Sequence, residues 1–247
     1  MGVYSGYLIC TDLDGTFVDN KSELIEKNLE AGERYMEGGG LFTVSTGRAA
    51  HYLKANYGER LKINTHLICL NGTMIFDTEK DKILYSRYMK REDIADINNY
   101  WKSAKGAYFH TEYAAYTDFD AIPRNEEIHK IVFVSETEEK TFDLRKRLEK
   151  RYGDICDFNR SWPTGLEMLP KGAGKGDCIR KLREILGNKV HTVIAAGDFE
   201  NDLTMIKEAD IGVAVLNAME LVKSAADKIT VSNEDGAIAK IIEEIKV

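Results

Sequence analysis

The alternation of short apolar runs with helical segments constrains the fold more than any other feature of this sequence. The first apolar runs cover residues 7–10, 41–45 and 66–70, and helical patterns cover residues 23–36 and the stretch after Gly47. Strands and helices that alternate with short connections are typical of a doubly wound sheet with helices on both faces. We therefore predict an α/β fold with a Rossmann-like, mostly parallel sheet.

The rhythm changes in the middle of the chain and returns near its end. Residues 82–89 alternate between apolar and polar positions, which is typical of a sheet with one face in water. The middle region contains predicted strands over 107–110, 129–134 and 155–159, and predicted helices over 92–104 and 138–152. The last region contains predicted helices over 177–186, 205–209 and 238–245, and predicted strands over 190–196 and 211–215.

This change of rhythm predicts that one domain is inserted into another. We expect a discontinuous core domain of residues 1–80 and 170–247, and an inserted α+β cap domain of residues 81–169. The chain would cross between them near residues 76–82 and again near residues 162–172. Two of the three prolines, Pro163 and Pro170, lie in the second crossing.

The charge balance excludes one class of partner. The chain has 41 acidic and 34 basic residues and a net charge of −7, whereas a general nucleic-acid binder carries a basic field. No apolar stretch reaches the roughly 18 residues of a membrane-spanning helix, and residues 1–6 lack the pattern of a signal peptide. The four cysteines form no CxxC pair, and Cys10 and Cys69 lie in apolar runs. We therefore expect a cytoplasmic protein with free thiols that binds neither nucleic acid nor membranes.

Small polar residues follow each predicted core strand. These loops are Asp12-Leu13-Asp14-Gly15-Thr16, Thr46-Gly47-Arg48, Asn71-Gly72 and Gly197-Asp198-Phe199-Glu200-Asn201-Asp202. Ligands of an open parallel sheet bind beyond the carboxyl ends of its strands, and clustered carboxylates repel one another unless a cation holds them. A hard cation with oxygen ligands fits best, and Mg²⁺ in particular combines a few carboxylates with substrate phosphate.

These loops, together with Lys175, resemble the four motifs of the haloacid dehalogenase-like superfamily. The order of the motifs and the large insertion between the second and the third are similar to the Cof-type hydrolases, which are sugar-phosphatase-like members with an α/β cap. The resemblance covers essentially the whole chain. It departs from the family pattern at Leu216, before Asn217-Ala218, where a Met-Gly-type sequence is expected.

The resemblance implies roles for the acidic residues and one lysine. Asp12 is the expected nucleophile, because a carboxylate can attack phosphorus and split one displacement into two. Asp14, two residues on, is the expected general acid and base, with its backbone carbonyl on the metal. The metal ligands would be Asp12, Asp14 and Asp198. Lys175 would neutralise the charge on the transferring phosphoryl group and shield Asp12 from its repulsion.

The remaining loop residues are predicted to bind or support the phosphate. Thr46 and Gly47 lie where a strand meets a helix, and free N–H groups at a helix N-terminus suit a phosphate oxygen; Arg48 either reaches the substrate or braces the loop. We also assign substrate or phosphate binding to Leu13, Asn71, Lys175 and Asn201. Thr16 would tie down the first loop, and Asp202 would orient Lys175 or support the metal through water. Turn formation and helix capping are the alternative explanations for these acids.

The sequence predicts the roles of cap residues less specifically than those of the core loops. The aromatic stretch Tyr108-Phe109-His110, with Tyr113 and Tyr116, either faces a sugar or packs within the cap. We interpret His110 as a structural histidine. Closure of a cap would exclude water from phosphoryl transfer.

Together these features predict a Mg²⁺-dependent phosphatase that hydrolyses small phosphorylated metabolites, in particular sugar phosphates, through an aspartyl-phosphate. Two alternatives share the fold: a phosphosugar mutase or phosphotransferase, and a non-catalytic protein that binds a phosphometabolite. No feature indicates an oligomeric state.

Overall fold

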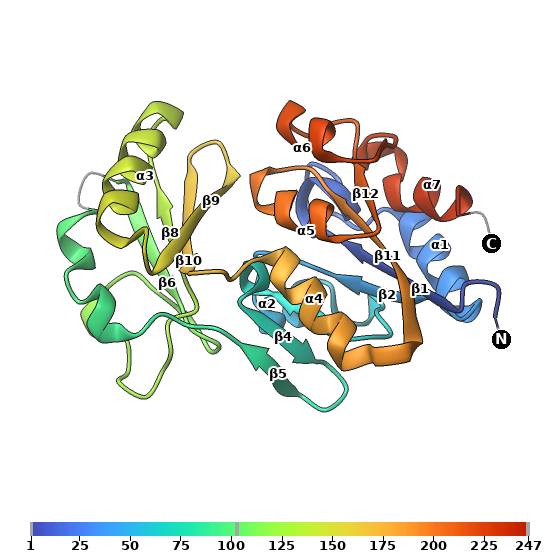
Figure 1. The fold of residues 1–247 in the computed structure, drawn as a ribbon, viewed down its shortest axis with the longest axis horizontal. Coiled ribbons are helices and arrows are strands. Elements are labelled where there is room, and N and C mark those ends of the chain that lie inside the picture. Colours follow the sequence, from blue (N-terminus) through green and yellow to red (C-terminus); the bar gives the residue numbers. More distant parts are fainter. Residues whose placement is uncertain (1, 102–103, 246–247) are drawn as a thin grey trace.

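Two five-stranded sheets divide the molecule into two parts, which lie side by side in Figure 1. The computed structural model describes residues 2–101 and 104–245. Both chain ends lie on the part at the right of Figure 1, which we call the core, and the inserted segment forms the part at the left, which we call the cap.

The core sheet has the order β13-β12-β11-β1-β2, and every neighbouring pair of its strands is parallel. Its two central strands, β1 and β11, are mostly buried, as expected for a parallel sheet with both faces covered. This confirms the predicted α/β fold with a parallel core. The strands are β1 (Gly6–Thr11), β2 (Leu41–Val44), β11 (Val190–Gly197), β12 (Ile211–Ala214) and β13 (Lys228–Ile229).

Helices cover both faces of the core sheet. On one face, Ile9 of β1 packs in a cluster with Tyr35 of α1 (Glu26–Glu37) and Ile238 of α7 (Ala237–Glu243). On the other face, Leu8 packs in a cluster with Ile179 of α4 (Lys175–Leu186) and with α5 (Leu203–Glu208). Successive strand residues point to opposite faces, so both faces of β1 can be apolar. Two further core helices are α2 (Ala50–Asn56) and α6 (Glu220–Ala225).

The third predicted strand, β3 (Leu67–Cys69), leaves the parallel sheet almost at once. Only one parallel bridge, between Ser45 and Ile68, joins it to β2, and it pairs antiparallel with β4 (Met74–Asp77), which in turn pairs with β5 (Lys82–Ser86). The reversal takes place where Leu70, Asn71 and Gly72 have positive φ.

The pairing of β5 bears on where the cap begins. Residues 82–86 form a strand, as their alternation predicted, but the strand pairs with β4 and its Ile83 packs against the core. An alternating pattern predicts a strand but does not predict which strand pairs with it. A domain boundary at residue 81 would separate β4 from its partner β5. We propose that the first crossing lies between β5 and Met89, since Met89 bridges to Ile128 of the cap.

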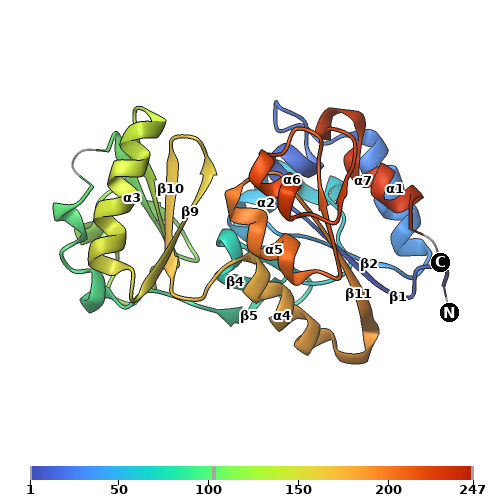
Figure 2. The ribbon, with the colours of Figure 1, turned by 45° about the horizontal axis from the view of Figure 1, so that its top comes forward.

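The cap contains an antiparallel sheet with the order β7-β6-β8-β10-β9 and one long helix, α3 (Glu138–Tyr152), whose bounds match the prediction. Phe133 and Leu166 pack with Leu144 and Leu148 of α3 on one face of this sheet. In both ribbon views the sheet stands between α3 and the core (Figure 2). The strands are β6 (Gly106–His110), β7 (Ala115–Tyr116), β8 (Lys130–Val134), β9 (Cys156–Trp162) and β10 (Gly165–Pro170).

Two predicted features of the cap differ from the structure. Residues 92–104 were predicted as one helix, but their described part contains two short 3₁₀ helices, Arg91–Ile94 and Ile97–Asn99; Lys102 and Ser103 lie outside the described residues. Strand β10 was missed because all of its residues are buried, so no alternation marks it, and because Pro170 suggested a break.

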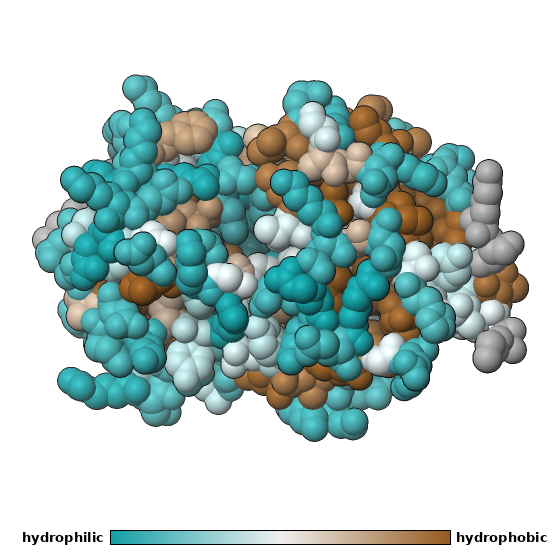
Figure 3. Space-filling view, in the orientation of Figure 1, coloured by the Kyte–Doolittle hydropathy of each residue, from teal (hydrophilic) through white to brown (hydrophobic). Residues whose placement is uncertain are grey.

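Three further features concern the surface, the cysteines and the helices of the molecule. Figure 3 shows hydrophilic side chains over most of the visible cap, and apolar ones gathered mainly over the core. All four cysteines, Cys10, Cys69, Cys156 and Cys178, are buried and free. Among the described residues, no helix is both long and apolar enough to span a membrane.

Candidate active site

Three carboxylates meet at the carboxyl end of the core sheet. Asp12 directly follows β1, and its backbone N–H donates to the carbonyl of Ala196 in the neighbouring strand β11 (2.8 Å). Asp198 and Asp202 belong to the loop that follows β11. Oxygen atoms of Asp12, Asp198 and Asp202 lie within 4.8 Å of one another, because β1 and β11 are adjacent parallel strands.

Lys175 is the buried counter-charge of this cluster. Its Nζ donates to Oδ1 of Asp12 (2.5 Å) and to Oδ1 of Asp202 (2.6 Å), and its side chain is fully buried. Lys175 is the first residue of α4, which approaches α5 closely: a Cβ on Gly176 would lie 2.3 Å from the carbonyl oxygen of Thr204. This close packing brings the lysine beneath the two carboxylates.

The carboxylates carry more negative charge than one ammonium compensates. Burial and the neighbouring Asp202 raise the pKa of Asp12 well above its usual range, and the same two causes raise the pKa of Asp198. Burial alone would lower the pKa of Lys175, but Asp12 and Asp202 raise it above its ordinary value. A cation bound among these oxygens would remove the repulsion, so the donor set fits a divalent metal.

The hydrogen bonds of the cluster indicate which carboxylates are available to a metal. Asp202 accepts from Lys175 through Oδ1, and from the backbone N–H groups of Asp198 (2.9 Å) and Phe199 (3.1 Å) through Oδ2. Both of its oxygens are therefore engaged. Asp198 accepts one bond, from Thr16 (3.0 Å). Asp12 and Asp198 are thus the better ligands.

A glycine allows the first loop to approach Asp198. Gly15 has a φ of +78°, and a Cβ at this position would lie 2.6 Å from Oδ2 of Asp198. Both the backbone conformation and the space therefore require glycine. The carbonyl of Gly15 accepts a hydrogen bond from Asn217 (2.8 Å), which holds the loop from its other side.

Asp14 lies at the edge of the cluster and is paired with Arg48. Nε of Arg48 donates to one carboxylate oxygen (2.7 Å) and Nη2 to the other (2.5 Å). The side chain of Asp14 is 45% exposed, whereas Asp12 is buried. Arg48 also stacks on the ring of Tyr52, 4.4 Å from its centroid. Two roles were predicted for Arg48, binding the substrate or bracing the loop. The contact with Asp14 corresponds to the bracing role.

A second group of polar residues lies between the loops that follow β2, β3 and β11. The backbone N–H of Asn71 donates to the carbonyl of Thr46 (2.9 Å), and Nδ2 of Asn201 donates to Oδ1 of Asn71 (3.1 Å). Among the described residues, Oδ1 of Asn201 is buried and has no partner. These contacts join three loops that are distant in sequence.

A cavity of about 680 Å³ lies between the core and the cap. Five predicted site residues are buried and do not line it: Thr16, Thr46, Asn71, Lys175 and Asp202. The side chain of Leu13 packs in the apolar core cluster. A substrate contact from Leu13 would therefore come from its backbone. Six predicted site residues line the cavity: Asp12, Asp14, Gly47, Arg48, Asp198 and Asn201.

The cap wall of this cavity contains residues that the sequence did not single out. These are Lys130, Ser161, Trp162 and Glu167, and they line the cavity beside Tyr108 and His110, which the sequence did single out. They lie on strands that form one sheet, so only the pairing of distant strands brings them together, and no local motif marks them.

The aromatic stretch of the cap divides between the predicted roles. Tyr108 and His110 line the cavity, whereas Phe109 is buried in the cap cluster. Tyr113 is largely exposed, and the hydroxyl of Tyr116 donates to Glu126. Burial and the nearby Lys130 lower the pKa of His110 to about 3, so its imidazole is neutral, in line with a structural histidine.

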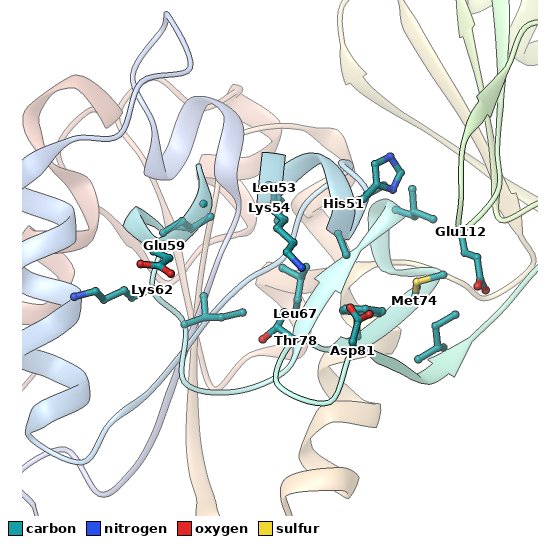
Figure 4. A pocket seen from close by; sticks show the side chains of 18 of the residues that line it. His51, Leu53, Lys54, Glu59, Lys62, Leu67, Met74, Thr78, Asp81 and Glu112 are labelled. Atoms are coloured by element: carbon teal, nitrogen blue, oxygen red, sulfur yellow. The ribbon is translucent and has the colours of Figure 1, made fainter. Parts of the chain in front are cut away.

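A larger hollow, of about 1330 Å³, lies along α2 and the β3–β5 hairpin. Figure 4 shows Lys54, Thr78 and Asp81 along it, with His51 and Glu112 at its end nearest the cap. None of the three clustered carboxylates lines it, so we assign the chemistry to the smaller cavity.

Comparison with known proteins identifies the family. The profile of the haloacid dehalogenase-like hydrolases matches residues 9–120 and 107–242. A 5-amino-6-(5-phospho-D-ribitylamino)uracil phosphatase of Bacillus subtilis is 30% identical over 245 residues, which cover 95% of this chain and 94% of that protein.

Solved structures share the fold. A haloacid dehalogenase-like hydrolase from Bacillus subtilis superimposes with a TM-score of 0.87 at 24% identity, over 97% of this chain and 99% of the other. A sugar phosphatase of subclass IIB superimposes with a TM-score of 0.80 at 23% identity, over 96% and 98%. The chain therefore belongs to the haloacid dehalogenase-like hydrolases, in their Cof-type group, and is a phosphatase.

Proposed function

We propose that this phosphatase is Mg²⁺-dependent and hydrolyses small phosphorylated sugars or sugar alcohols through an aspartyl-phosphate on Asp12. The observation that carries the proposal is the contact of Asp12 with a fully buried ammonium, inside a cluster of three carboxylates of which Asp12 and Asp198 line a capped cavity. A carboxylate held this way is shielded from the repulsion of an anionic phosphate.

Asp12 and Asp14 would divide the work. The Asp12 carboxylate attacks phosphorus, and the bond between phosphorus and the leaving ester oxygen breaks. The phosphoryl group is thereby transferred to Asp12. Asp14 gives a proton to the leaving alkoxide and later takes one from the water that attacks phosphorus, which breaks the bond between phosphorus and the Asp12 carboxylate and releases phosphate. Because Arg48 engages both carboxylate oxygens of Asp14, we propose that this ion pair loosens when the substrate binds.

The phosphate would bind between the loops that follow the strands. The proposed donors to its oxygens are the backbone of Leu13 and Gly47, the Thr46 hydroxyl, the amide of Asn201 and the ammonium of Lys175. Asn71 would act through its bond to Asn201. Nδ2 of Asn201 has two N–H donors, and Asn71 accepts one of them, so this side chain keeps a donor for the phosphate.

A magnesium ion would be held by the carboxylates of Asp12 and Asp198 and by the backbone carbonyl of Asp14. Bound there, it would supply positive charge to the phosphate oxygens as the phosphoryl group is transferred. Thr16 would hold the Asp198 carboxylate through its hydrogen bond, Gly15 leaves the space that this carboxylate occupies, and Asp202 would position Lys175.

The substrate class rests on the cavity and on the relatives. The cavity has room for a small metabolite, and its cap wall combines charged and aromatic side chains. The relative from Bacillus subtilis is named for a substrate that carries its phosphate on a ribityl chain, and one structural neighbour is named a sugar phosphatase. Both support a phosphorylated polyhydroxy compound as the substrate.

The test is phosphate release from a panel of sugar, sugar-alcohol and aryl phosphates. The wild-type protein should need Mg²⁺ and lose activity in EDTA, and Asp12→Asn should lower kcat by about 10³-fold or more on every substrate. Asp143→Asn, at an exposed position of α3, is the matched control and should behave as wild type. Activity in Asp12→Asn equal to that of the control would contradict the mechanism.

A further inference from the structure

A buried ion pair faces the cavity from the cap. Nζ of Lys130 in β8 lies 2.9 Å from Oε2 of Glu167 in β10, and the two side chains are 4% and 2% exposed. Both residues line the same cavity as Asp12. Their neighbours Ile131 and Leu166 point into the apolar cluster beneath α3, so the pair lies on the face of the cap sheet that is turned toward the core.

The pair touches the loops assigned above to the phosphate. Nζ of Lys130 donates to the carbonyl of Gly47 (2.7 Å). Oε1 of Glu167 accepts from the hydroxyl of Ser161 (2.7 Å), and that hydroxyl in turn accepts from Nδ2 of Asn71 (3.0 Å). The pair therefore lies directly above the phosphate loops, where the first carbon atoms beyond the phosphate ester would be.

Both groups retain hydrogen-bonding capacity. An ammonium has three N–H donors, and the described residues provide two acceptors for Lys130, Gly47 and Glu167. Each oxygen of Glu167 accepts one bond, from Ser161 or from Lys130, and a carboxylate oxygen has room for a second. One donor and at least one acceptor thus remain for a ligand in the cavity.

Stability does not account for this pair. Burying two charges removes both from water at a large desolvation cost, and apolar residues of similar size usually stabilise a protein as well or better. The opposite face of the same sheet is packed with apolar side chains. The pair stands where β8 and β10 face the cavity, which indicates a role toward a ligand.

We propose that Lys130 and Glu167 are specificity-determining residues that bind hydroxyl groups on the carbons next to the phosphate ester. Glu167 accepts the proton of one hydroxyl and Lys130 donates to the oxygen of the same or the adjacent one, since a hydroxyl is both donor and acceptor. A substrate without these hydroxyls leaves the remaining donor of Lys130 and the remaining acceptor of Glu167 without a partner in the closed cavity and is rejected. This inference rests on the proposed phosphatase function.

The test compares polyhydroxylated phosphates with partners of the same carbon skeleton that lack the hydroxyls. Suitable pairs are ribitol 5-phosphate with pentyl phosphate, glycerol 3-phosphate with propyl phosphate, and glucose 6-phosphate with tetrahydropyran-2-ylmethyl phosphate. For at least one pair, wild-type kcat/KM should favour the hydroxylated member by about 100-fold or more, the value of one or two hydrogen bonds to charged groups.

The decisive variant removes both charges at once. Lys130→Gln with Glu167→Gln leaves no unpaired buried charge, so it avoids the penalty of either single change, and its folding is checked by thermal unfolding. It should lower the hydroxyl preference by at least about tenfold, chiefly through KM. Glu139→Gln, the same chemical change at an exposed position of α3, should leave the preference as in wild type.

The outcomes separate this proposal from the function on which it rests. A wild-type enzyme that hydrolyses both members of every pair equally well overturns the specificity proposal and leaves the phosphatase mechanism standing. A double variant that keeps the full preference also overturns it. If no phosphate monoester is hydrolysed while Mg²⁺ is present, the proposed function itself fails, and this inference fails with it.

Discussion

On the core wall of the cavity the polar residues follow directly after strands, whereas on the cap wall they lie within strands. Asp12 and Asp198 come from loops at the ends of β1 and β11, and Gly15 fits against Asp198 with no room for a Cβ. Lys130 and Glu167 belong to β8 and β10 and meet only through strand pairing. The core wall is therefore built by short local motifs and the cap wall by long-range register.

This difference suits the two walls to different tasks: the core wall to phosphoryl transfer and the cap wall to recognition of the substrate. Local motifs hold charged groups in one arrangement, which suits the transfer of a phosphoryl group common to all substrates. A sheet face can change one side chain at a time without moving its neighbours, which suits recognition of the variable part. We therefore expect core variants to lower activity on all substrates alike, and cap variants to change the order of substrates.

The largest effect is expected for Lys175→Met. Loss of the ammonium leaves Asp12 and Asp202 without their counter-charge, so kcat should fall by about 10³-fold. The fall should be the same for a polyol phosphate and its deoxy partner. Lys171→Met, four residues earlier and on the surface, is the control and should keep wild-type kinetics. A loss confined to polyol phosphates would contradict the division between core and cap.

Gly15→Ala tests the close fit of the first loop. The new Cβ would lie 2.6 Å from Oδ2 of Asp198 at a φ of +78°, which should destabilise the protein by about 1–3 kcal/mol and weaken Mg²⁺ binding. Chemical denaturation and a Mg²⁺ titration measure the two effects. Gly106→Ala in the cap, where the nearest neighbouring atom would be 3.9 Å away, should do neither. Equal effects of the two substitutions would show that the core loop is not specially constrained.

The carboxylate cluster should make stabilisation by Mg²⁺ depend on pH. The pKa of Asp198 is raised to about 7, so the folded protein without metal binds a proton more tightly than the unfolded chain. The contribution of Asp198 to stability is therefore fully present below its ordinary pKa, about 4, and is lost as the pH rises toward 7.

Magnesium removes this penalty, since it binds the charged form. The increase in Tm on addition of Mg²⁺ should thus be larger near pH 8 than near pH 5.5. Differential scanning fluorimetry measures the shift, and Asp198→Asn should flatten its pH dependence. A Tm increase that is larger at the lower pH would contradict this assignment of the metal site.

The smallest effect is expected at the ionic contact that joins the two walls. Glu200, in the loop of Asp198 and Asp202, pairs with Arg145 (2.5 Å) and Arg160 (3.0 Å) of the cap. Glu200→Gln should weaken cap closure and raise KM a few-fold with little change in kcat, because partly buried pairs contribute modestly.

The salt dependence provides the second readout. Added salt should raise KM in wild type more than in Glu200→Gln, since the variant lacks the screened contact. Glu149→Gln removes another partner of Arg145, but one within the cap, and should leave KM unchanged. An equal rise of KM in both variants would show that the contact stabilises the cap and does not join it to the core.

The sequence predicted the core better than the cap, for physical reasons. The parallel sheet, α3 and the family could be predicted, because periodicity and motifs are local signals. Strand β10 could not, since its buried residues do not alternate, and the pairing of β5 with β4 depends on a reversal through Leu70 and Asn71 at positive φ.

The candidate site divides in the same way. Asp12, Lys175 and Asp198 were singled out from their motifs and meet in the structure, although their roles stay predictions. Lys130 and Glu167 carry no sequence signal: one opens β8, the other lies in the missed strand β10, and a lone lysine or glutamate is far more often exposed. Only the pairing of β8 with β10 brings them together.

The most direct test of the central claim, covalent catalysis by Asp12, is to trap the phosphorylated enzyme. The reaction with a good substrate and Mg²⁺ is quenched with acid during turnover and treated with borohydride, which reduces an acyl phosphate to an alcohol. Mass spectrometry of the two peptides that contain residues 8–17 and residues 197–203 then locates the change. The account predicts reduction at Asp12 alone. Reduction at Asp14 or Asp198, or two unmodified peptides during a measured burst of product, would contradict it.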